Sequence, residues 1–302
     1  MVLGCDVSII IVNYNTYNLV LQCIESVIKN TKKISYEIIV VDNNSPNREI
    51  EKLNEIYPNV KLVLNTKNSG FGIANNIGNK YANGKFLFLL NSDTIVLDNS
   101  IYTLYKFMVE NPCVGACGGN LCDIDLKPAT SFTRFMPSIL SDIDSLLFNG
   151  ISRILYNKDS FYSTETSPFK ISGNISGADL MLSKAVFDEL GGFDENFFMY
   201  YEETDLLFRL RNKGYQTYIV PTSKIIHLEG ASETFKPIKL DWTHQSKKKY
   251  YIKNKTRFEF MLSNIIFKLM VMQRLFIFKI INNEGKYSYW LSLYKWLRSK
   301  NM

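Results

Sequence analysis

The chain has 302 residues, of which 46% are hydrophobic and 21% charged, a composition typical of a globular protein with one large domain or two small ones. Its net charge of +6 argues against a nucleic-acid-coating protein, although the positive residues cluster at 247–257 and indicate a local anionic partner. The five cysteines include no C-x-x-C pair, which favours free thiols in a reducing cytoplasm. The first apolar run is only strand-length, so no signal peptide is expected.

Strand-like and helix-like segments alternate in the first part of the chain. Short runs of apolar, often β-branched residues predict strands buried on both faces, at Val7–Val12, Glu37–Val41, Val60–Leu64 and Phe86–Leu90. Helical patterns fall between them, at about 16–29, 48–57 and 72–81. This order predicts a mostly parallel sheet with helices on both of its faces.

Polar residues follow each of the four strands, in the segments 13–15, 42–44, 65–70 and 91–93. Ligands of open α/β sheets bind outside the carboxyl ends of the strands, so four polar clusters at one edge predict a pocket. The turn after the first strand reads NYNTYN and has no glycine, which argues against a dinucleotide-binding loop, and the chain has no P-loop sequence.

The second half of the chain is less regular. Residues 113–126 are small and Gly-rich, and residues 130–167 form a mixed segment. Helices are predicted from about 183 and over 204–213, and strands over 216–220 and 223–226. From Pro237 onward the pattern is basic, aromatic and helical.

Three features carry candidate chemistry. Asp93 and Asn91 end an apolar strand, where one carboxylate can bind Mg²⁺ or Mn²⁺ beside a diphosphate, although such a pattern also occurs in ordinary turns. The stretch YYEETDL places three acids at a helix start, which the helix dipole also favours, but nearby aromatic residues favour a desolvated general base. His227 is one of two histidines and ends a strand; a buried core histidine is the alternative.

Seven motifs occur in order between Val7 and Ser232: SIIIVNYN, EIIVVDNNSPN, NSGFGIANNIGN, FLFLLNSD, ISGADLML, GGFDENFFMYYEETDLLFRLRNKGY and HLEGAS. With them the chain resembles the inverting glycosyltransferases of family 2, which have the GT-A fold, and particularly the rhamnosyltransferase-like branch. The resemblance implies a catalytic domain over 1–236 and a helical extension over 237–302. The nucleotide-sugar-binding half would comprise about 1–112, and the acceptor-side half 113–236.

The resemblance also implies roles for single residues. Those on the donor side would be Val12, Asn13, Asn15, Asp42, Asn68, Gly70, Phe71, Asn76, Asn91, Ser92 and Asp93. Asp93 would hold Mg²⁺ or Mn²⁺, with His227 as a second ligand. Glu203 aligns with the catalytic acid and would deprotonate the acceptor hydroxyl, while Glu202 and Asp205 remain alternative bases.

Two positions depart from the family pattern. Asn91 stands where the D-x-D motif has its first acid, so the metal site carries less negative charge. Glu203 stands where the Glu-Asp pair has its aspartate, so the base is one methylene longer, with a similar intrinsic pKa. These departures leave a non-catalytic carbohydrate-binding relative as an alternative. A sugar nucleotidyltransferase is a second one, although it would be expected to have a Gly-rich basic loop in place of NYNTYN.

The implied activity is metal-assisted transfer of rhamnose or a similar hexose from a nucleoside-diphosphate sugar to a hydroxyl of a growing cell-surface glycan or lipid-linked acceptor. Segment 257–302 begins with a long apolar stretch that Lys268, Arg274 and Lys279 interrupt, which predicts an amphipathic helix rather than a membrane span. This segment is expected either to pack on the catalytic domain or on a second subunit, or to bind the inner face of the cell membrane from the cytoplasm.

Overall fold

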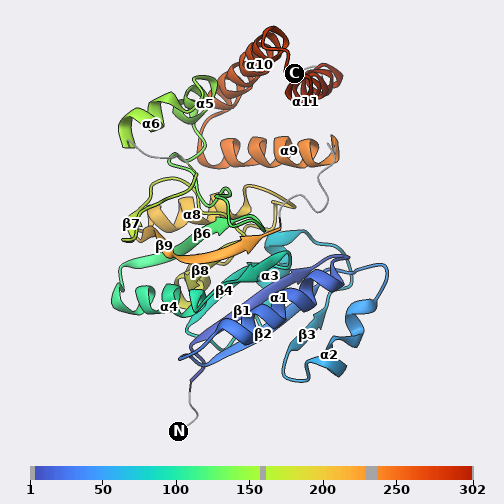
Figure 1. Ribbon diagram of the computed structural model, residues 1–302, viewed down its shortest axis with the longest axis vertical. Coiled ribbons are helices and arrows are strands. Elements are labelled where there is room, and N and C mark those ends of the chain that lie inside the picture. The colour runs from blue at the N-terminus through green and yellow to red at the C-terminus, as the bar shows by residue number, and fades with distance from the viewer. Residues whose placement is uncertain (1–3, 157–160, 229–236, 301–302) are drawn as a thin grey trace. The chain divides into compact units, whose positions relative to one another are not determined.

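The computed structural model describes residues 4–156, 161–228 and 237–300 (Figure 1). The chain divides into two compact units, the first comprising 1–134 and 161–231 and the second 135–160 and 232–302. The described residues 135–156 therefore group with the C-terminal helices. The division into a catalytic domain over 1–236 and a helical extension over 237–302 stays a prediction. All five cysteines lie in the described residues and are free thiols.

Four parallel strands form the first half of the sheet, in the order β3-β2-β1-β4. They are β1 (Val7–Asn13), β2 (Tyr36–Asp42), β3 (Lys61–Leu64) and β4 (Phe86–Asn91). The connections contain α1 (Tyr17–Asn30), the 3-10 helix η1 (Glu49–Lys52), α2 (Leu53–Ile56) and α3 (Phe71–Asn79). All four predicted strands and the alternating order are therefore confirmed.

The side chains of β1 explain why helices cover both faces of this sheet. Ile9 and Ile11 pack in one hydrophobic cluster with residues of α1, whereas Ile10 packs in a second cluster with Ala74 of α3. Successive side chains of a strand point to opposite faces, so a continuous apolar run needs cover on both. The α1 and α3 ribbons cover the sheet accordingly (Figure 1).

The second half of the sheet is mixed rather than parallel. β8 (Asp179–Ser183) pairs antiparallel with β4 and with β6 (Val114–Cys122), and β6 runs parallel to β9 (Gln216–His227). Two short strands, β5 (Thr94–Val96) and β7 (Phe169–Lys170), pair antiparallel with β9. The sequence pattern predicts two strands where the structure has the single β9, and it predicts no strand for the Gly-rich β6.

The composition of β6 explains why its strand was missed. The strand is buried along its whole length, and its glycines let neighbouring groups approach closely. A Cβ atom at Gly118 would lie 2.5 Å from Ile175, and one at Gly119 would lie 2.6 Å from the carbonyl oxygen of Ser223. Small residues are required there, so the strand lacks the large β-branched side chains by which strands are recognised.

The remaining helices of the first unit are α4 (Ser100–Glu110), α7 (Lys184–Glu189) and α8 (Glu202–Asn212). α8 begins two residues before its predicted start, so all three candidate acids lie inside its first turn. Tyr200 and Tyr201 precede it with φ angles of 66° and 67°, a backbone conformation that tyrosine rarely adopts. Such strain is typical of functional sites.

The second unit is helical, as predicted for the residues after Pro237. Its helices are α5 (Ile139–Leu146), α6 (Gly150–Tyr156), α9 (Pro237–Asn254), α10 (Arg257–Ile280) and α11 (Glu284–Ser299). A small core contains Val271, Leu293, Trp296 and Leu297. Among the helices of the described residues, α10 is the one whose length and composition would suit a membrane span, with a mean hydropathy of 1.5 and 22% of its apolar window buried.

Candidate functional site

A buried hydrogen-bond network joins the ends of β1 and β2. The Asn13 Nδ2 atom donates to Asp42 Oδ1 over 2.6 Å and to Ser45 Oγ over 3.1 Å. Ser45 donates its hydroxyl to Asp42 Oδ1 over 2.6 Å and its N–H to Oδ2 over 2.9 Å. Both carboxylate oxygens of Asp42 therefore accept bonds from the protein. In this structure Asp42 shapes the turn, and its contact with a nucleotide stays a prediction.

The other donor-side residues lie along the same edge of the sheet. Val12 is partly exposed, and Asn15 has an exposed side chain, a φ of 62° and an N–H that donates to Ser45 Oγ over 2.8 Å. Asn68 Oδ1 accepts bonds from Asn43 Nδ2 at 2.9 Å and from the N–H of Gly70 at 3.1 Å. The strand ends and the loop before α3 are thus tied together.

Gly70 and Phe71 connect this loop to the segment before α8. Gly70 has a φ of +86°, and a Cβ atom there would lie 2.0 Å from the carbonyl oxygen of Phe198. The N–H of Phe71 donates to that oxygen over 3.2 Å, and the Phe71 ring packs edge-on against Phe193. Only glycine allows this approach. Asn76 exchanges two hydrogen bonds of 2.8 Å with the backbone of Phe193, so its amide supports this segment.

Asn91, Ser92, Asp93 and His227 come together because β5 pairs with β9, which places Thr94 opposite His227. The Asp93 Oδ1 atom lies 3.3 Å from His227 Nε2, and Asn91 Nδ2 lies 3.5 Å from the same nitrogen. Ser92 Oγ lies 3.0 Å from the hydroxyl of Thr16, at the start of α1. The side chain of Asp93 is 32% exposed and that of His227 is 7% exposed, so the carboxylate meets solvent while the imidazole is fixed.

The Asp93–His227 pair fits a divalent ion. Two ligand atoms that bind one ion at right angles, each about 2.1 Å away, lie about 3.0 Å apart, close to the observed separation. No group of three or more His, Cys, Asp or Glu side chains in the described residues is arranged to hold a metal. Further ligands could be the amide oxygen of Asn91 and oxygen atoms of a bound diphosphate or of water, which Mg²⁺ and Mn²⁺ accept.

Asp179 lies beside this pair and was not singled out from the sequence. It is fully buried at the start of β8, where its Oδ2 atom accepts a bond of 2.7 Å from the N–H of Gly119. Its Oδ1 atom has no hydrogen-bond partner in the described part of the chain. Burial raises the pKa of Asp179 well above its usual range, and nearby His227 lowers it only in part. The available signal was an acid inside the apolar motif ISGADLML.

The three acids of α8 have different surroundings. Glu202 is 3% exposed, and its Oε2 atom has no hydrogen-bond partner among the described residues. Glu203 is partly exposed, and its Oε1 atom accepts a bond of 3.1 Å from Asn174 Nδ2. Asp205 is fully buried and forms an ion pair of 2.7 Å with Arg209. Arg209 also binds the carbonyl oxygens of Leu190 and Gly192, so Asp205 belongs to a structural network.

These surroundings separate the pKa values of Glu202 and Glu203. Burial raises the pKa of Glu202 well above its usual range, and the charge of Glu203 raises it further. Burial also raises the pKa of Glu203, but backbone N–H groups at the start of α8 and the hydrogen bond from Asn174 lower it. Of the two carboxyl groups, Glu203 has the weaker rise in pKa and gives up its proton more readily than Glu202. Two neighbouring carboxyl groups whose pKa values differ in this way are typical of acid–base sites.

Asn174 is held by backbone bonds to Thr133: its carbonyl oxygen accepts from the Thr133 N–H over 2.8 Å, and its N–H donates to Thr133 Oγ1 over 3.0 Å. A few residues later, the carbonyl oxygen of Ala178 accepts a bond of 3.1 Å from the N–H of Asn91. Residues 174–178 thus connect Glu203 to the strand end beside Asp93. Asn174 immediately precedes the motif ISGADLML, but no pattern in the sequence indicates its contact with Glu203.

We expect Asn174→Ala to move the acidic limb of the pH–activity profile to higher pH. Removing the hydrogen bond removes a contact that favours the ionised form, so the pKa of Glu203 rises. The measurement is kcat/KM for sugar transfer as a function of pH. Asn79→Ala is the matched control, because it removes an amide bond of 2.7 Å to Asp188 instead. An unshifted Asn174→Ala profile, or an equal shift in the control, would contradict this role.

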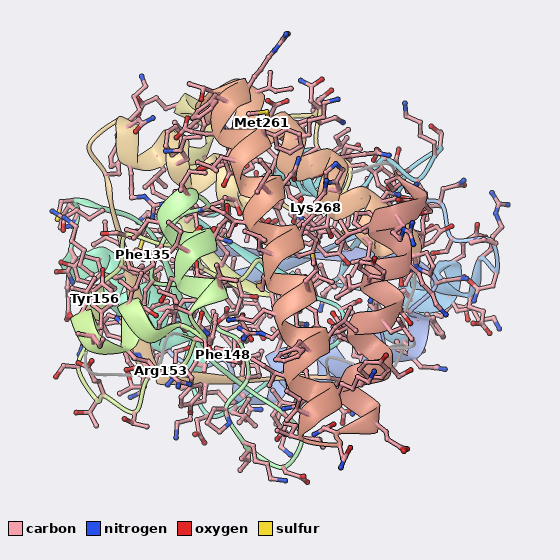
Figure 2. The ribbon with its side chains drawn as sticks, turned by 90° about the horizontal axis from the view of Figure 1, so that it is seen from above. Phe135, Phe148, Arg153, Tyr156, Met261 and Lys268 are labelled. Atoms are coloured by element: carbon pink, nitrogen blue, oxygen red, sulfur yellow. The ribbon has the colours of Figure 1, made fainter. Side chains whose placement is uncertain are left out.

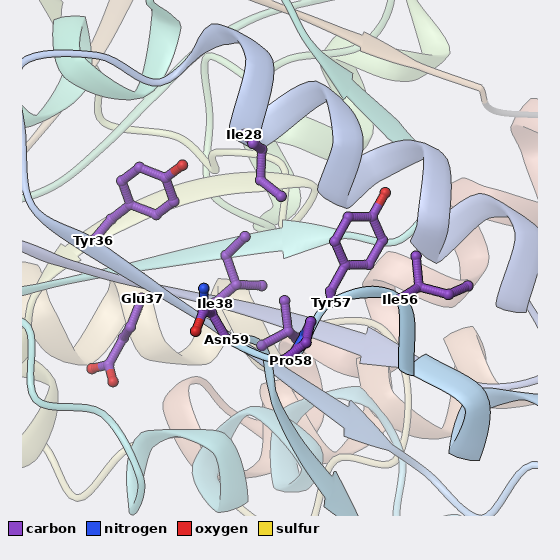
Figure 3. Close-up of a pocket in the computed structure, with 9 residues that line it drawn as sticks. Ile28, Tyr36, Glu37, Ile38, Ile56, Tyr57, Pro58 and Asn59 are labelled. Atoms are coloured by element: carbon purple, nitrogen blue, oxygen red, sulfur yellow. The ribbon is translucent and has the colours of Figure 1, made fainter. Parts of the chain in front are cut away.

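A cavity of about 420 Å³ lies elsewhere in the first unit (Figure 3). It is lined by residues at the start of β2, such as Tyr36 and Ile38, and by the segment between α2 and β3, including Tyr57 and Asn59. Asp42 is at the other end of β2. The cavity is therefore separate from the carboxyl edge where the candidate site lies.

Comparison with known proteins agrees with this geometry. The sequence model of "Glycosyl transferase family 2" matches residues 8–190. The chain is 28% identical over 219 residues to the dTDP-rhamnosyl transferase RfbF of Shigella flexneri, covering 71% of this chain and 67% of RfbF. It is 26% identical over 228 residues to the rhamnosyltransferase WbbL of Escherichia coli, covering 73% and 83%. The O-antigen biosynthesis protein RfbC of Myxococcus xanthus is 28% identical, but the chain spans only 17% of it.

A crystal structure of GalNAc-T7 with UDP, GalNAc and Mn²⁺ superimposes with a TM-score of 0.57 at 20% identity, over 76% of this chain and 45% of that one. This likeness shows the fold. The family model covers more than half of the sequence, and the rhamnosyltransferases named above are among the homologues. The chain therefore belongs to glycosyl transferase family 2 and has the GT-A fold.

Proposed function

We propose that this glycosyltransferase transfers rhamnose or a similar hexose, with inversion, from a nucleoside-diphosphate sugar to a hydroxyl of a growing cell-surface glycan or lipid-linked acceptor. The observation that carries the proposal is that the Asp93–His227 pair at the sheet edge is combined with a partly exposed glutamate, Glu203, which accepts a hydrogen bond from Asn174. The rhamnosyltransferase homologues support the choice of sugar.

On the donor side, Asp93 and His227 would hold Mg²⁺ or Mn²⁺, and the amide of Asn91 would lie beside the ion. Bound there, the ion would neutralise negative charge on the departing nucleoside diphosphate. The partly exposed Val12, the exposed Asn15 and the tied loop at Asn68 and Gly70 would wall the nucleotide pocket. Asn15 is hydrogen-bonded to Ser45, and Gly70 to Asn68, so these parts of the wall are ordered without the donor.

On the acceptor side, Glu203 would accept the proton of the attacking hydroxyl. The acceptor oxygen then forms a bond to the anomeric carbon as the bond to the diphosphate oxygen breaks, and a single displacement inverts that carbon. Asn174 orients the Glu203 carboxylate, and burial raises the pKa of the neighbouring Glu202, which disfavours a second negative charge there. Asp205 is committed to Arg209, so we assign the base to Glu203.

A panel of nucleotide sugars tests this function. With Mn²⁺ present, dTDP-rhamnose is expected to raise the melting temperature by roughly 5 °C near a hundred-fold excess over its Kd, and to be hydrolysed slowly or transferred. UDP-glucose and UDP-N-acetylglucosamine are the parallel samples. dTDP without sugar and dTDP-rhamnose with EDTA are the controls. Binding without any turnover would favour a non-catalytic relative, and no shift with any sugar nucleotide would reject the proposal.

A further inference from the structure

Helix α10 exposes a continuous apolar stripe. Its members are Phe258, Met261, Ile265, Leu269, Met272, Phe276 and Ile280, whose exposed fractions range from 44% to 68%. They follow one another at spacings of three or four residues, which places them on one face of the helix over about 33 Å. Apolar exposure on this scale is unusual on a monomeric soluble protein and marks an interaction surface.

Polar contacts within the second unit fix which face of α10 points outward. On the opposite face, Ser263 donates a hydrogen bond to Asp142 of α5. Arg274 Nη2 donates to the carbonyl oxygen of Ser145 over 2.8 Å, and its guanidinium stacks on the ring of Phe148. Val271 packs with α11 in the core. The helix cannot roll to bury the stripe without breaking these contacts.

Basic residues border the stripe along one side. Arg257, Lys268 and Lys279 follow at intervals of eleven residues, about three helical turns, so they lie nearly in line. Figure 2 shows Lys268 and Met261 along the same helix, next to α5. Lysine and arginine with long aliphatic stems are suited to the edge of a helix that lies in a bilayer interface.

The charge of the whole second unit points in the same direction. Residues 135–160 and 232–302 contain 17 Lys and Arg against 7 Asp and Glu, a net charge of +10. The first unit has 18 against 22, a net charge of −4. Only the unit that exposes the apolar stripe therefore carries a net positive charge.

We propose that this face of α10 docks on an anionic bilayer surface, with the stripe in the interface and Arg257, Lys268 and Lys279 at the headgroups. Pairing of two copies through this face would bring two +10 units together and is disfavoured by their repulsion. If α10 spanned the membrane, lipid would also surround the face that now packs on α5. Arg274 and the Ser263–Asp142 contact would then lie in hydrocarbon, which is costly for polar groups. The proposal rests on the proposed function only for its purpose, which is to hold the enzyme near a lipid-linked acceptor.

Vesicle flotation of the full chain tests the docking, and it needs neither donor nor acceptor. The protein is expected to float with phosphatidylcholine vesicles that contain phosphatidylglycerol, and much less with phosphatidylcholine alone. Leu269→Glu is expected to weaken binding about ten-fold or more, because it removes a buried leucine from the interface. Replacing Lys268 and Lys279 together with Gln is expected to weaken it about thirty-fold and to reduce its dependence on salt.

Two matched control variants have comparable substitutions in the first unit. Val109→Glu substitutes a residue of α4 that is 50% exposed, and Lys32→Gln with Lys80→Gln removes two exposed lysines. Both are expected to float like the unmodified chain, and circular dichroism checks that each variant is folded. Absence of binding to anionic vesicles, or unchanged binding by Leu269→Glu, would overturn the proposal. So would a dimer in solution that Leu269→Glu converts to a monomer.

Discussion

Glu203→Gln is expected to lower kcat for sugar transfer by about 10²- to 10⁴-fold, the usual contribution of a general base, while the Kd for the donor stays unchanged. Glutamine has the size of glutamate, and its carbonyl oxygen can still accept the hydrogen bond from Asn174. It cannot take the acceptor's proton. Steady-state transfer rates and donor binding by calorimetry separate the loss of chemistry from a loss of binding.

Glu202→Gln is the matched control in the same helical turn. Burial and the charge of Glu203 raise the pKa of Glu202 and so favour its protonated form, which an amide resembles, and the loss of kcat is expected to stay below about ten-fold. The buried Oε2 atom has no partner among the described residues, so no hydrogen bond is lost with it. If Glu202→Gln abolished transfer while Glu203→Gln kept it, the base would be Glu202.

The raised pKa of Glu202 also predicts how the free energy of unfolding changes with pH. The folded state raises the pKa of Glu202, so it binds the proton more tightly than the unfolded chain does. This contribution is fully present below the ordinary glutamate pKa and is lost as pH rises through the folded value. Between these two pKa values, the urea midpoint of the unmodified chain is expected to fall as pH rises. The midpoint of Glu202→Gln should fall less, because glutamine does not titrate.

The first half of the fold was predictable because its signals are local. Continuous apolar runs mark β1, β2 and β4, and the polar residues after them lie together because parallel strands end at one edge. β6 was not recognisable, since its small residues reflect what packs against Gly118 and Gly119 from distant parts of the chain. Sequence periodicity cannot report such a neighbour.

The residues of the candidate site were likewise predictable only where their signals are local. The sequence indicated Asp93 and Glu203, which stand in motifs, but not Asn174, whose two partners lie 41 residues before and 29 residues after it. The sequence also gives no sign of the hydrogen bond from the Asn76 amide to the backbone of Phe193, 117 residues away, and the predicted donor-side role of Asn76 stays a prediction. One distinction was within reach of the sequence: Arg209 stands four residues after Asp205, the spacing of a helical ion pair.

Asp93→Asn is expected to weaken Mn²⁺ binding and to lower the rate of sugar transfer by about 10²-fold or more. Among Asn91, Ser92, Asp93 and His227, only Asp93 has a carboxylate, and that carboxylate is partly exposed to solvent. His227 and Asn91 would remain, but neither carries negative charge at neutral pH. His227→Gln should have a smaller effect, since it leaves that charge in place. Calorimetric titration with Mn²⁺ in the presence of dTDP measures the binding directly, independently of turnover.

Asp98→Asn is the matched control, because Asp98 is an exposed aspartate five residues further along the chain and asparagine tolerates its φ of 44°. It should bind Mn²⁺ and transfer sugar as the unmodified chain does. Unchanged Mn²⁺ binding by Asp93→Asn would reject the metal assignment. The departure at Asn91 makes this test sharp: where the family motif has two acids this chain has one, so no second carboxylate of the motif can compensate for the loss of Asp93.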